Sequence, residues 1–228
     1  MYIEKTLVCG FEPALRGMRN PMESWIKSDT IYDYAAGIKL NEFGQRVPEW
    51  PRIGENDMKC IQDRFRPGTT DERKFIRQII IWADFLLPID LWSEADTYKV
   101  ATVRDSCSTM HKLGHRDLAP MDFEKEDVDE YDLSQLNAMG KAMREKLPFI
   151  DSKTGKRYEG LTLLEHMKHR LPSGYIQRAT YMMSYETAIN MYRARRHHRL
   201  PQWSGPDGIC AWIRSLPYMA EFLPMLGL

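Results

Sequence analysis

Arg195 is the side chain whose type and position suggest binding chemistry most directly. The sequence predicts a helix over residues 180–196, and a rotation of about 100° per residue places several aromatic residues on one face. Arg195 falls on that face, together with Tyr181, Tyr185, Ala188 and Tyr192. In one interpretation the arginine stem packs on the tyrosines while the guanidinium reaches solvent or an acidic partner. In the other, a cleft holds the guanidinium, which grips a phosphate or a base edge through paired hydrogen bonds.

Cys107 is a candidate nucleophile. It stands between Ser106 and Ser108 in the sequence. A thiol reacts as its thiolate, which nearby cations favour, and Lys99 and Arg104 are the candidate cations. The alternative is a small, half-buried cysteine that serves only in packing. The sequence leaves both interpretations open.

Two histidine pairs have spacings that also occur in metal sites. His111 and His115 are four residues apart, and His166 and His169 are three apart. No glutamate follows His111 directly, and Gly114 weakens a helix at that point. We therefore predict no metal site.

A basic segment and an acidic segment stand out in the charge pattern. Residues 193–199 hold four arginines and two histidines, whereas residues 122–132 hold seven acidic side chains and one lysine. The basic segment alone would suggest nucleic-acid binding, but a helix C-terminus also favours cations through its dipole. Because the whole chain has 32 basic and 32 acidic residues, we expect no nucleic-acid partner.

Composition places the chain among ordinary globular proteins. Its 228 residues are 43% hydrophobic, which is enough for one substantial core. None of the four cysteines forms a Cys-x-x-Cys pair, so we expect reduced thiols and a cytoplasmic protein. A charged pair at Glu4-Lys5 argues against a signal peptide, and the most apolar run, residues 75–92, carries too many charges to span a membrane.

The elements that must position these side chains form an α+β pattern in a single domain, residues 1–228. We predict strands over residues 2–9 and 75–86, short helical pieces over 11–50, and an exposed loop over 147–160. Breaks are expected at Pro13, Pro21, Gly37, Gly44, Pro48 and Pro67-Gly68. Helices are predicted over residues 55–65, 88–98, about 133–143, 161–170, 180–196 and 208–223, the last interrupted near Pro217.

Residues 170–203 resemble the C-terminal half of the flavin-dependent thymidylate synthases. The residues that carry the resemblance are Arg170-Leu171-Pro172, Tyr175, Arg178, Asn190, Arg195 and Gln202-Trp203. The register is ungapped from Leu171 to Arg195, and Gln202-Trp203 needs a one-residue insertion. The resemblance implies that family's fold, with a mixed or antiparallel sheet and several long helices, and a homotetramer with active sites between subunits.

The chain departs from the family where the flavin signature is expected. That signature is Arg-His-Arg, then seven residues, a serine, and an arginine two residues later. The corresponding residues here are Thr97-Tyr98-Lys99, Cys107 and Thr109, so that only Lys99 keeps a charge. The resemblance implies cofactor contacts at Tyr98, Lys99, Asn190 and Gln202.

The resemblance implies one-carbon transfer from methylenetetrahydrofolate to C5 of a deoxypyrimidine monophosphate such as dUMP, with FAD supplying a hydride. Arg170 and Arg195 match nucleotide-binding positions, and the nucleotide contacts implied beside them are Glu94, Asp105, Ser106, Cys107 and Ser108. If FAD has been lost, hydroxymethyl transfer becomes the expected reaction, because it needs no hydride. In a different family of thymidylate synthases a cysteine attacks C6 of the pyrimidine, the role open to Cys107. The alternatives are an inactive nucleotide-binding protein on this scaffold and a nucleic-acid binder that uses residues 193–199.

Overall fold

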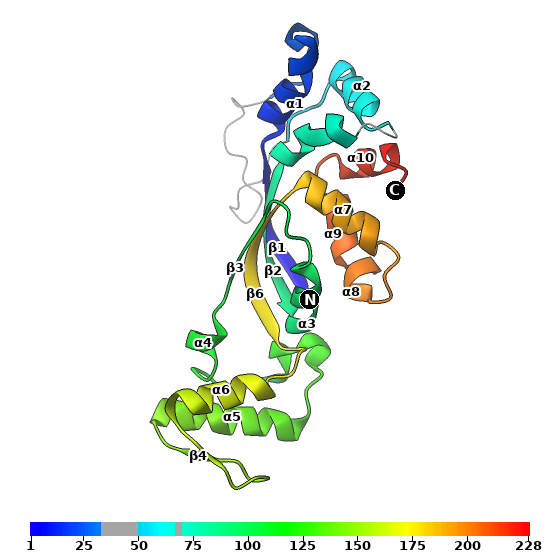
Figure 1. Cartoon of the computed structure of the whole chain (residues 1–228). Helices are drawn as coiled ribbons and strands as arrows, with labels where there is room; N and C mark the ends of the chain where they lie inside the picture. The colour runs from blue at the N-terminus through cyan, green and yellow to red at the C-terminus, as the bar shows by residue number, and fades with distance from the viewer. Residues whose placement is uncertain (33–49, 67–69) are drawn as a thin grey trace, which may run out of the picture. The chain divides into compact units, whose positions relative to one another are not determined.

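The structure is a computed structural model that describes residues 1–32, 50–66 and 70–228 (Figure 1). The breaks predicted at Gly37, Gly44, Pro48 and Pro67-Gly68 lie outside the described residues. The break predicted at Pro13 is wrong, because a helix spans Phe11–Arg19 and holds Pro13 in its first turn, where a proline is tolerated. The chain divides into two compact units. Unit 1 comprises Met1–Ile3, Asp84–Thr97 and Arg104–Thr180, and unit 2 comprises Glu4–Ala83, Tyr98–Val103 and Tyr181–Leu228. The single domain over residues 1–228 stays a prediction.

One four-stranded sheet runs through the chain in the order β1-β2-β6-β3. Its strands are β1 (Tyr2–Cys9), β2 (Ile80–Pro88), β3 (Thr102–Ser106) and β6 (Ile176–Ser184). Alternate residues of β2 are buried, from Ile81 to Leu87, as a β-branched and aromatic strand with one face on a core requires. Helices and an antiparallel sheet together confirm the predicted α+β class.

Unit 2 surrounds its part of the sheet with short helices. They are α1 (Phe11–Arg19), η1 (Asn20–Met22), η2 (Trp25–Lys27), α2 (Glu55–Arg64), η3 (Thr70–Gln78), α7 (Tyr185–Arg195), α8 (Pro201–Ser204), α9 (Ile209–Ser215) and α10 (Met219–Met225). Phe65 joins three of these helices, since its ring lies 6.0 Å from that of Phe75 and 5.5 Å from that of Phe222. Gly10 makes the turn from β1 into α1 with φ of 97°, and a Cβ there would lie 2.1 Å from the carbonyl oxygen of Gln78.

Unit 1 has its own core between two helices that lie side by side, α5 and α6 (Figure 1). Its elements are α3 (Ile89–Ala95), α4 (Thr109–Lys112), η4 (Pro120–Asp122), η5 (Glu124–Glu126), α5 (Glu130–Glu145), β4 (Phe149–Ile150), β5 (Arg157–Tyr158) and α6 (Gly160–Arg170). The buried cluster consists of Leu113, Leu118, Phe123, Leu136, Met139, Leu163 and Met167. The apolar spacing that predicted a helix near residues 133–143 is confirmed by α5.

Three of the predicted elements are wrong in part. Residues 75–78 belong to η3, and β2 begins only at Ile80. Residues 180–184 belong to β6, because Ser184 caps α7 by accepting a hydrogen bond from the Thr187 N–H and so starts the helix at Tyr185. The predicted loop over 147–160 contains the β4–β5 hairpin.

A buried ion pair joins α1 to α2 in unit 2. Arg19 Nε donates to Asp57 Oδ1 at 2.6 Å, and the two side chains are 5% and 0% exposed. The second carboxylate oxygen of Asp57 accepts from the hydroxyls of Ser28 and Thr30. Burial alone would raise the pKa of Asp57, but the hydrogen bonds from Thr30, Ser28 and Arg19 outweigh it and hold that pKa below its usual range.

Among the helices of the described residues, none has both the length and the apolar character needed to cross a bilayer.

Replacing Asp57 with alanine should destabilise the protein strongly. The substitution leaves the Arg19 guanidinium buried without its carboxylate, a loss that costs about 3–5 kcal/mol. Urea unfolding measures this change in the free energy of unfolding. The control Asp63→Ala, on the same helix, removes an exposed ion pair with Arg66 and should cost less than about 1 kcal/mol. Equal losses in the two variants would contradict the role given to Asp57.

Candidate functional site

Arg195, the last residue of α7, is held by aromatic side chains within unit 2. Its Nε donates to the hydroxyl oxygen of Tyr98 at 3.0 Å. The guanidinium carbon lies 4.9 Å from the ring centroid of Trp203 and 5.9 Å from that of Tyr98. These contacts fix both the plane and the direction of the guanidinium, as cation–π packing with a hydrogen bond does.

The two aromatic side chains are themselves fixed. Trp203, on α8, is fully buried, and its ring centroid lies 6.3 Å from that of Tyr98. The carbonyl oxygen of Tyr98 accepts hydrogen bonds from the hydroxyls of Tyr181 and Thr102. Arg195 therefore packs on Tyr98 and Trp203, and Tyr181 contributes from β6 instead of from the predicted helical face.

His198 completes the surroundings of Arg195. Its Nε2 lies 2.9 Å from Arg195 Nη1, and its Nδ1 accepts from the Leu200 N–H at 3.2 Å. A neutral imidazole has one acceptor nitrogen, so His198 cannot accept from both groups at once. The Arg195 guanidinium, the His198 ring and the Leu200 N–H together contain more hydrogen-bond donors than acceptors. A group of this composition suits an anion.

The remaining predicted cofactor contacts in unit 2 differ in their surroundings. Lys99 is exposed. Asn190 is exposed on α7, where its Oδ1 accepts from Arg193 at 3.0 Å. Gln202 is half-buried on α8 beside Trp203. The structure thus brings Tyr98 to Arg195 directly, whereas Lys99 and Asn190 point to solvent.

Arg170, the last residue of α6, is held by carboxylates within unit 1. Its Nη1 lies 3.4 Å from Asp151 Oδ2, and its Nη2 lies 4.0 Å from Asp132 Oδ1. Asp151 is 4% exposed. The backbone N–H of Thr154 is the main cause that holds the pKa of Asp151 below its usual range, against the opposing effect of burial, and the N–H of Lys153 adds to it.

Cys107 follows β3 in unit 1, and hydrogen bonds fix its backbone. Its N–H donates to the carbonyl oxygen of Arg178 at 2.9 Å, and its carbonyl oxygen accepts from Gln177 at 2.6 Å. The side chain is exposed. Of the other predicted nucleotide contacts, Asp105 is exposed and Ser106 half-buried on β3, Ser108 caps α4 by accepting from the His111 N–H, and Glu94 is half-buried on α3.

The described part of the chain contains no group of three or more His, Cys, Asp or Glu side chains placed to hold a metal ion.

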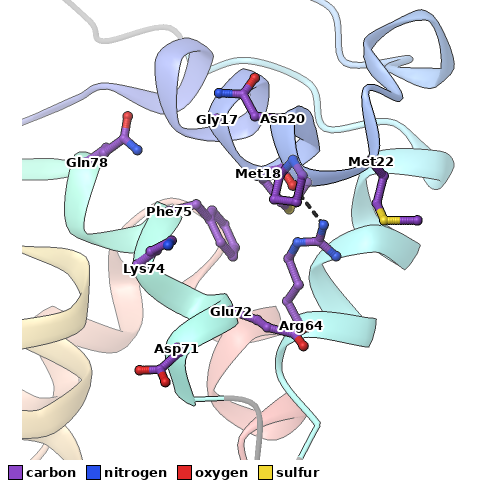
Figure 2. A pocket seen from close by; sticks show the side chains of 11 residues that line it. Gly17, Met18, Asn20, Met22, Arg64, Asp71, Glu72, Lys74, Phe75 and Gln78 are labelled. Carbon is purple, nitrogen blue, oxygen red and sulfur yellow. Dashed lines mark hydrogen bonds between the residues drawn. The ribbon is translucent and has the colours of Figure 1, made fainter.

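A cavity of about 650 Å³ in unit 2 was not predicted from the sequence (Figure 2). Buried Met18 and Phe75 form its apolar part, and Arg64 Nη2 donates across it to the carbonyl oxygen of Met18 at 2.8 Å. The other lining residues are Gly17, Asn20, Pro21, Met22, Asp71, Glu72, Lys74 and Gln78. An apolar pocket of this size with a few polar groups is typical of small-molecule sites. Its residues come from three separate segments, residues 17–22, Arg64 and residues 71–78. Spacing along the sequence cannot show that these segments meet, and the charged residues 71–74 are the one feature of the sequence that draws attention to this region.

This arrangement of sheet and helices is the fold of the flavin-dependent thymidylate synthases. The chain is similar in structure to flavin-dependent thymidylate synthase ThyX from Helicobacter pylori complexed with FAD and dUMP, with a TM-score of 0.64 and 12% identity over 99% of this chain and 100% of that one. A second structure of the Helicobacter pylori enzyme with FAD and dUMP gives the same TM-score and identity over 100% of both chains. No protein-family model and no curated protein matches the chain in sequence.

Cysteine labelling should distinguish the exposed thiols from the one beside Arg195. Burial raises the pKa of Cys210 to about 11, although the charge of Arg195 acts in the opposite direction. With iodoacetamide at pH 8 we expect exposed Cys9 and Cys107 to be alkylated while Cys210 stays unmodified, because the thiolate is the reactive form. Peptide mass spectrometry measures the modification, with the urea-unfolded protein as the control in which every cysteine reacts. Labelling of Cys210 at the rate of Cys107 would contradict this burial.

Proposed function

We propose that this protein transfers a one-carbon unit from methylenetetrahydrofolate to C5 of a deoxypyrimidine monophosphate such as dUMP. The observation that carries the proposal is the likeness of the fold, over the whole chain, to enzymes whose structures hold FAD and dUMP. The orientation of Arg195 supports it independently, since a fixed guanidinium fork suits a phosphate or a pyrimidine carbonyl.

We assign binding of the nucleotide to Arg195 and Arg170. Arg195 keeps its direction through Tyr98 and Trp203, and Arg170 keeps its direction through Asp151. Pre-positioned charges bind a dianion without first having to order two long side chains, and they polarise a carbonyl oxygen in the same way. Further nucleotide contacts are proposed at Glu94, Asp105, Ser106 and Ser108.

We assign the nucleophile to Cys107. Its thiolate would add to C6 of the pyrimidine, which makes C5 nucleophilic toward the methylene group of the folate. The fixed backbone on both sides of this exposed side chain would hold the sulfur in a defined place. C5 would then lose its proton, tetrahydrofolate would leave the bound methylene carbon, and that carbon would take up either a hydride or water. Loss of the thiolate from C6 restores the pyrimidine ring.

The cavity of Figure 2 fits FAD only in part. Met18 and Phe75 would contact a planar ring and Arg64 and Lys74 would face phosphate groups, whereas Asp71 and Glu72 in the same lining would repel them. In its reduced form, FAD would supply a hydride and be left oxidised, so that each turnover would need a reductant. Further contacts with the cofactor are proposed at Tyr98, Lys99, Asn190 and Gln202. Methyl transfer requires the hydride, whereas hydroxymethyl transfer takes up water instead, so the product reports whether the flavin takes part.

Substituting Arg195 should weaken nucleotide binding strongly. Arg195→Ala deletes charge-assisted hydrogen bonds worth about 1.5–3 kcal/mol, so we expect dUMP affinity to fall about tenfold or more. Isothermal titration calorimetry measures the affinity for dUMP and dCMP. The matched control Arg193→Ala, on the exposed side of α7, should leave it unchanged. Size-exclusion chromatography should show the same assembly, proposed to be a homotetramer, in both variants. Unchanged dUMP binding by Arg195→Ala would overturn this assignment.

Product analysis should separate the two one-carbon reactions. We expect wild-type protein with dUMP and methylenetetrahydrofolate to give a C5-substituted product by mass spectrometry, and Cys107→Ser to lower its rate at least about a hundredfold, as the loss of a covalent nucleophile does. A methyl product that requires added FAD and a reductant supports the flavin reaction, and a hydroxymethyl product without FAD supports the redox-neutral one. Binding of dUMP without any product would contradict catalysis and leave a nucleotide-binding protein.

A further inference from the structure

A second pocket, of about 350 Å³, lies within unit 1 beside the β4–β5 hairpin. One side is a single face of α6, where Thr162, Glu165, His166 and His169 follow at helical spacing. The other side consists of Lys156, Arg157 and Tyr158. None of these residues belongs to the sites proposed above.

The hairpin side of this pocket is rigid because Asp151 organises its loop. Asp151 Oδ1 accepts from the backbone N–H groups of Lys153 and Thr154, each at 2.9 Å. The Asp151 N–H donates to the carbonyl oxygen of Lys156 at 2.9 Å. These hydrogen bonds close the loop on itself, and they therefore fix the backbone of Lys156 and Arg157.

His166 connects the hairpin to α6. Its ring stacks on that of Tyr158 with centroids 3.8 Å apart and planes within 9°. Its Nε2 lies 3.3 Å from Asp151 Oδ2, and its side chain is 15% exposed. The wall of the pocket at this point is thus a stacked aromatic pair beside a buried carboxylate, and stacking holds the histidine ring in place.

The polar groups of the pocket favour an anion. Lys156, Arg157, His166 and His169 are cationic or can become so, and Thr162 adds a hydroxyl donor. Among the described residues that line the pocket, Glu165 is the one carboxylate. The Nζ of Lys156 lies 5.1 Å from the ring centroid of Tyr158, and Arg157 is paired with Glu159 at 3.0 Å. A bound anion would compete with Glu159 for Arg157, so Lys156 is the principal cation of this side.

We propose that this pocket binds the phosphate group of a small molecule. Donors approach from the hairpin and from α6, and a tetrahedral anion can accept from both sides at once. The volume is at the lower end of the range for ligand pockets, which suits a compact phosphate ester. This site is separate from the nucleotide-binding function proposed for Arg195.

The test uses the Arg195→Ala variant as background, which weakens phosphate binding at the proposed nucleotide site. Inorganic phosphate is titrated by calorimetry and by NMR of the histidine rings. We expect saturable binding that shifts the His166 and His169 signals, and at least fivefold weaker binding in Lys156→Ala and in His169→Ala. Glu165→Gln should instead bind phosphate more tightly, and the control Lys141→Ala, exposed on α5, should match the background.

Lys156→Ala and Glu165→Gln are expected to change the phosphate affinity in opposite directions. A fold defect would weaken binding in every variant and would not produce the gain expected for Glu165→Gln. The proposal is overturned if phosphate leaves both histidine signals unchanged, or if Lys156→Ala and Glu165→Gln have the same affinity. Malonate that binds as tightly as phosphate would also overturn it, in favour of a dicarboxylate. Failure here leaves dUMP binding by the wild-type protein untouched.

Discussion

The burial of Arg19 against Asp57 is the interaction on which the N-terminal half of unit 2 depends. It holds the end of α1 against α2, and the hydroxyls of Ser28 and Thr30 extend the same network to the segment after η2. The cavity of Figure 2 takes its walls from these elements and from η3. A buried charge pair is an expensive way to join helices, since removing the charges from water offsets most of their attraction. The Arg19–Asp57 pair contributes mainly to the geometry of the contact between α1 and α2. An ion pair with several hydrogen bonds is satisfied in one arrangement of the helices, whereas apolar contacts are compatible with many.

Unit 1 uses a carboxylate in the same way, with a different consequence for its arginine. Asp151 closes the hairpin loop, orients His166 and contacts Arg170. Part of the positive charge of Arg170 is therefore already balanced, and a bound anion would compete with Asp151 for it. The contacts of Arg195 described above are instead with two aromatic side chains, Tyr98 and Trp203, and with the ring of His198. The two arginines are thus oriented in different ways, one by a carboxylate and the other by rings.

Local sequence patterns predicted those elements in which buried residues recur at regular spacing. They failed where hydrogen bonding between distant segments determines the secondary structure. The strand predicted over residues 2–9 and the three- and four-residue spacing in α5 are both present in the structure. Residues 180–184 continue an apolar, aromatic run into α7, so periodicity alone joined them to the helix, whereas hydrogen bonding to neighbouring strands makes them part of β6. The helical wheel identified Arg195 as an arginine among aromatic residues. The rings that hold it, Tyr98 and Trp203, come from outside the helix and could not be found from spacing, and neither could a cavity assembled from three segments.

The net charge of zero also has a different meaning once the contacts are known. A neutral total does not report how charge is distributed locally. Arg195 stands in the last turn of α7, where the helix dipole favours a cation, and it packs on two rings whose faces are electron-rich. The helix dipole and the ring faces both stabilise the positive charge where it is held. A guanidinium fixed in this way gives a small anion a local site on a protein that has no overall attraction for anions.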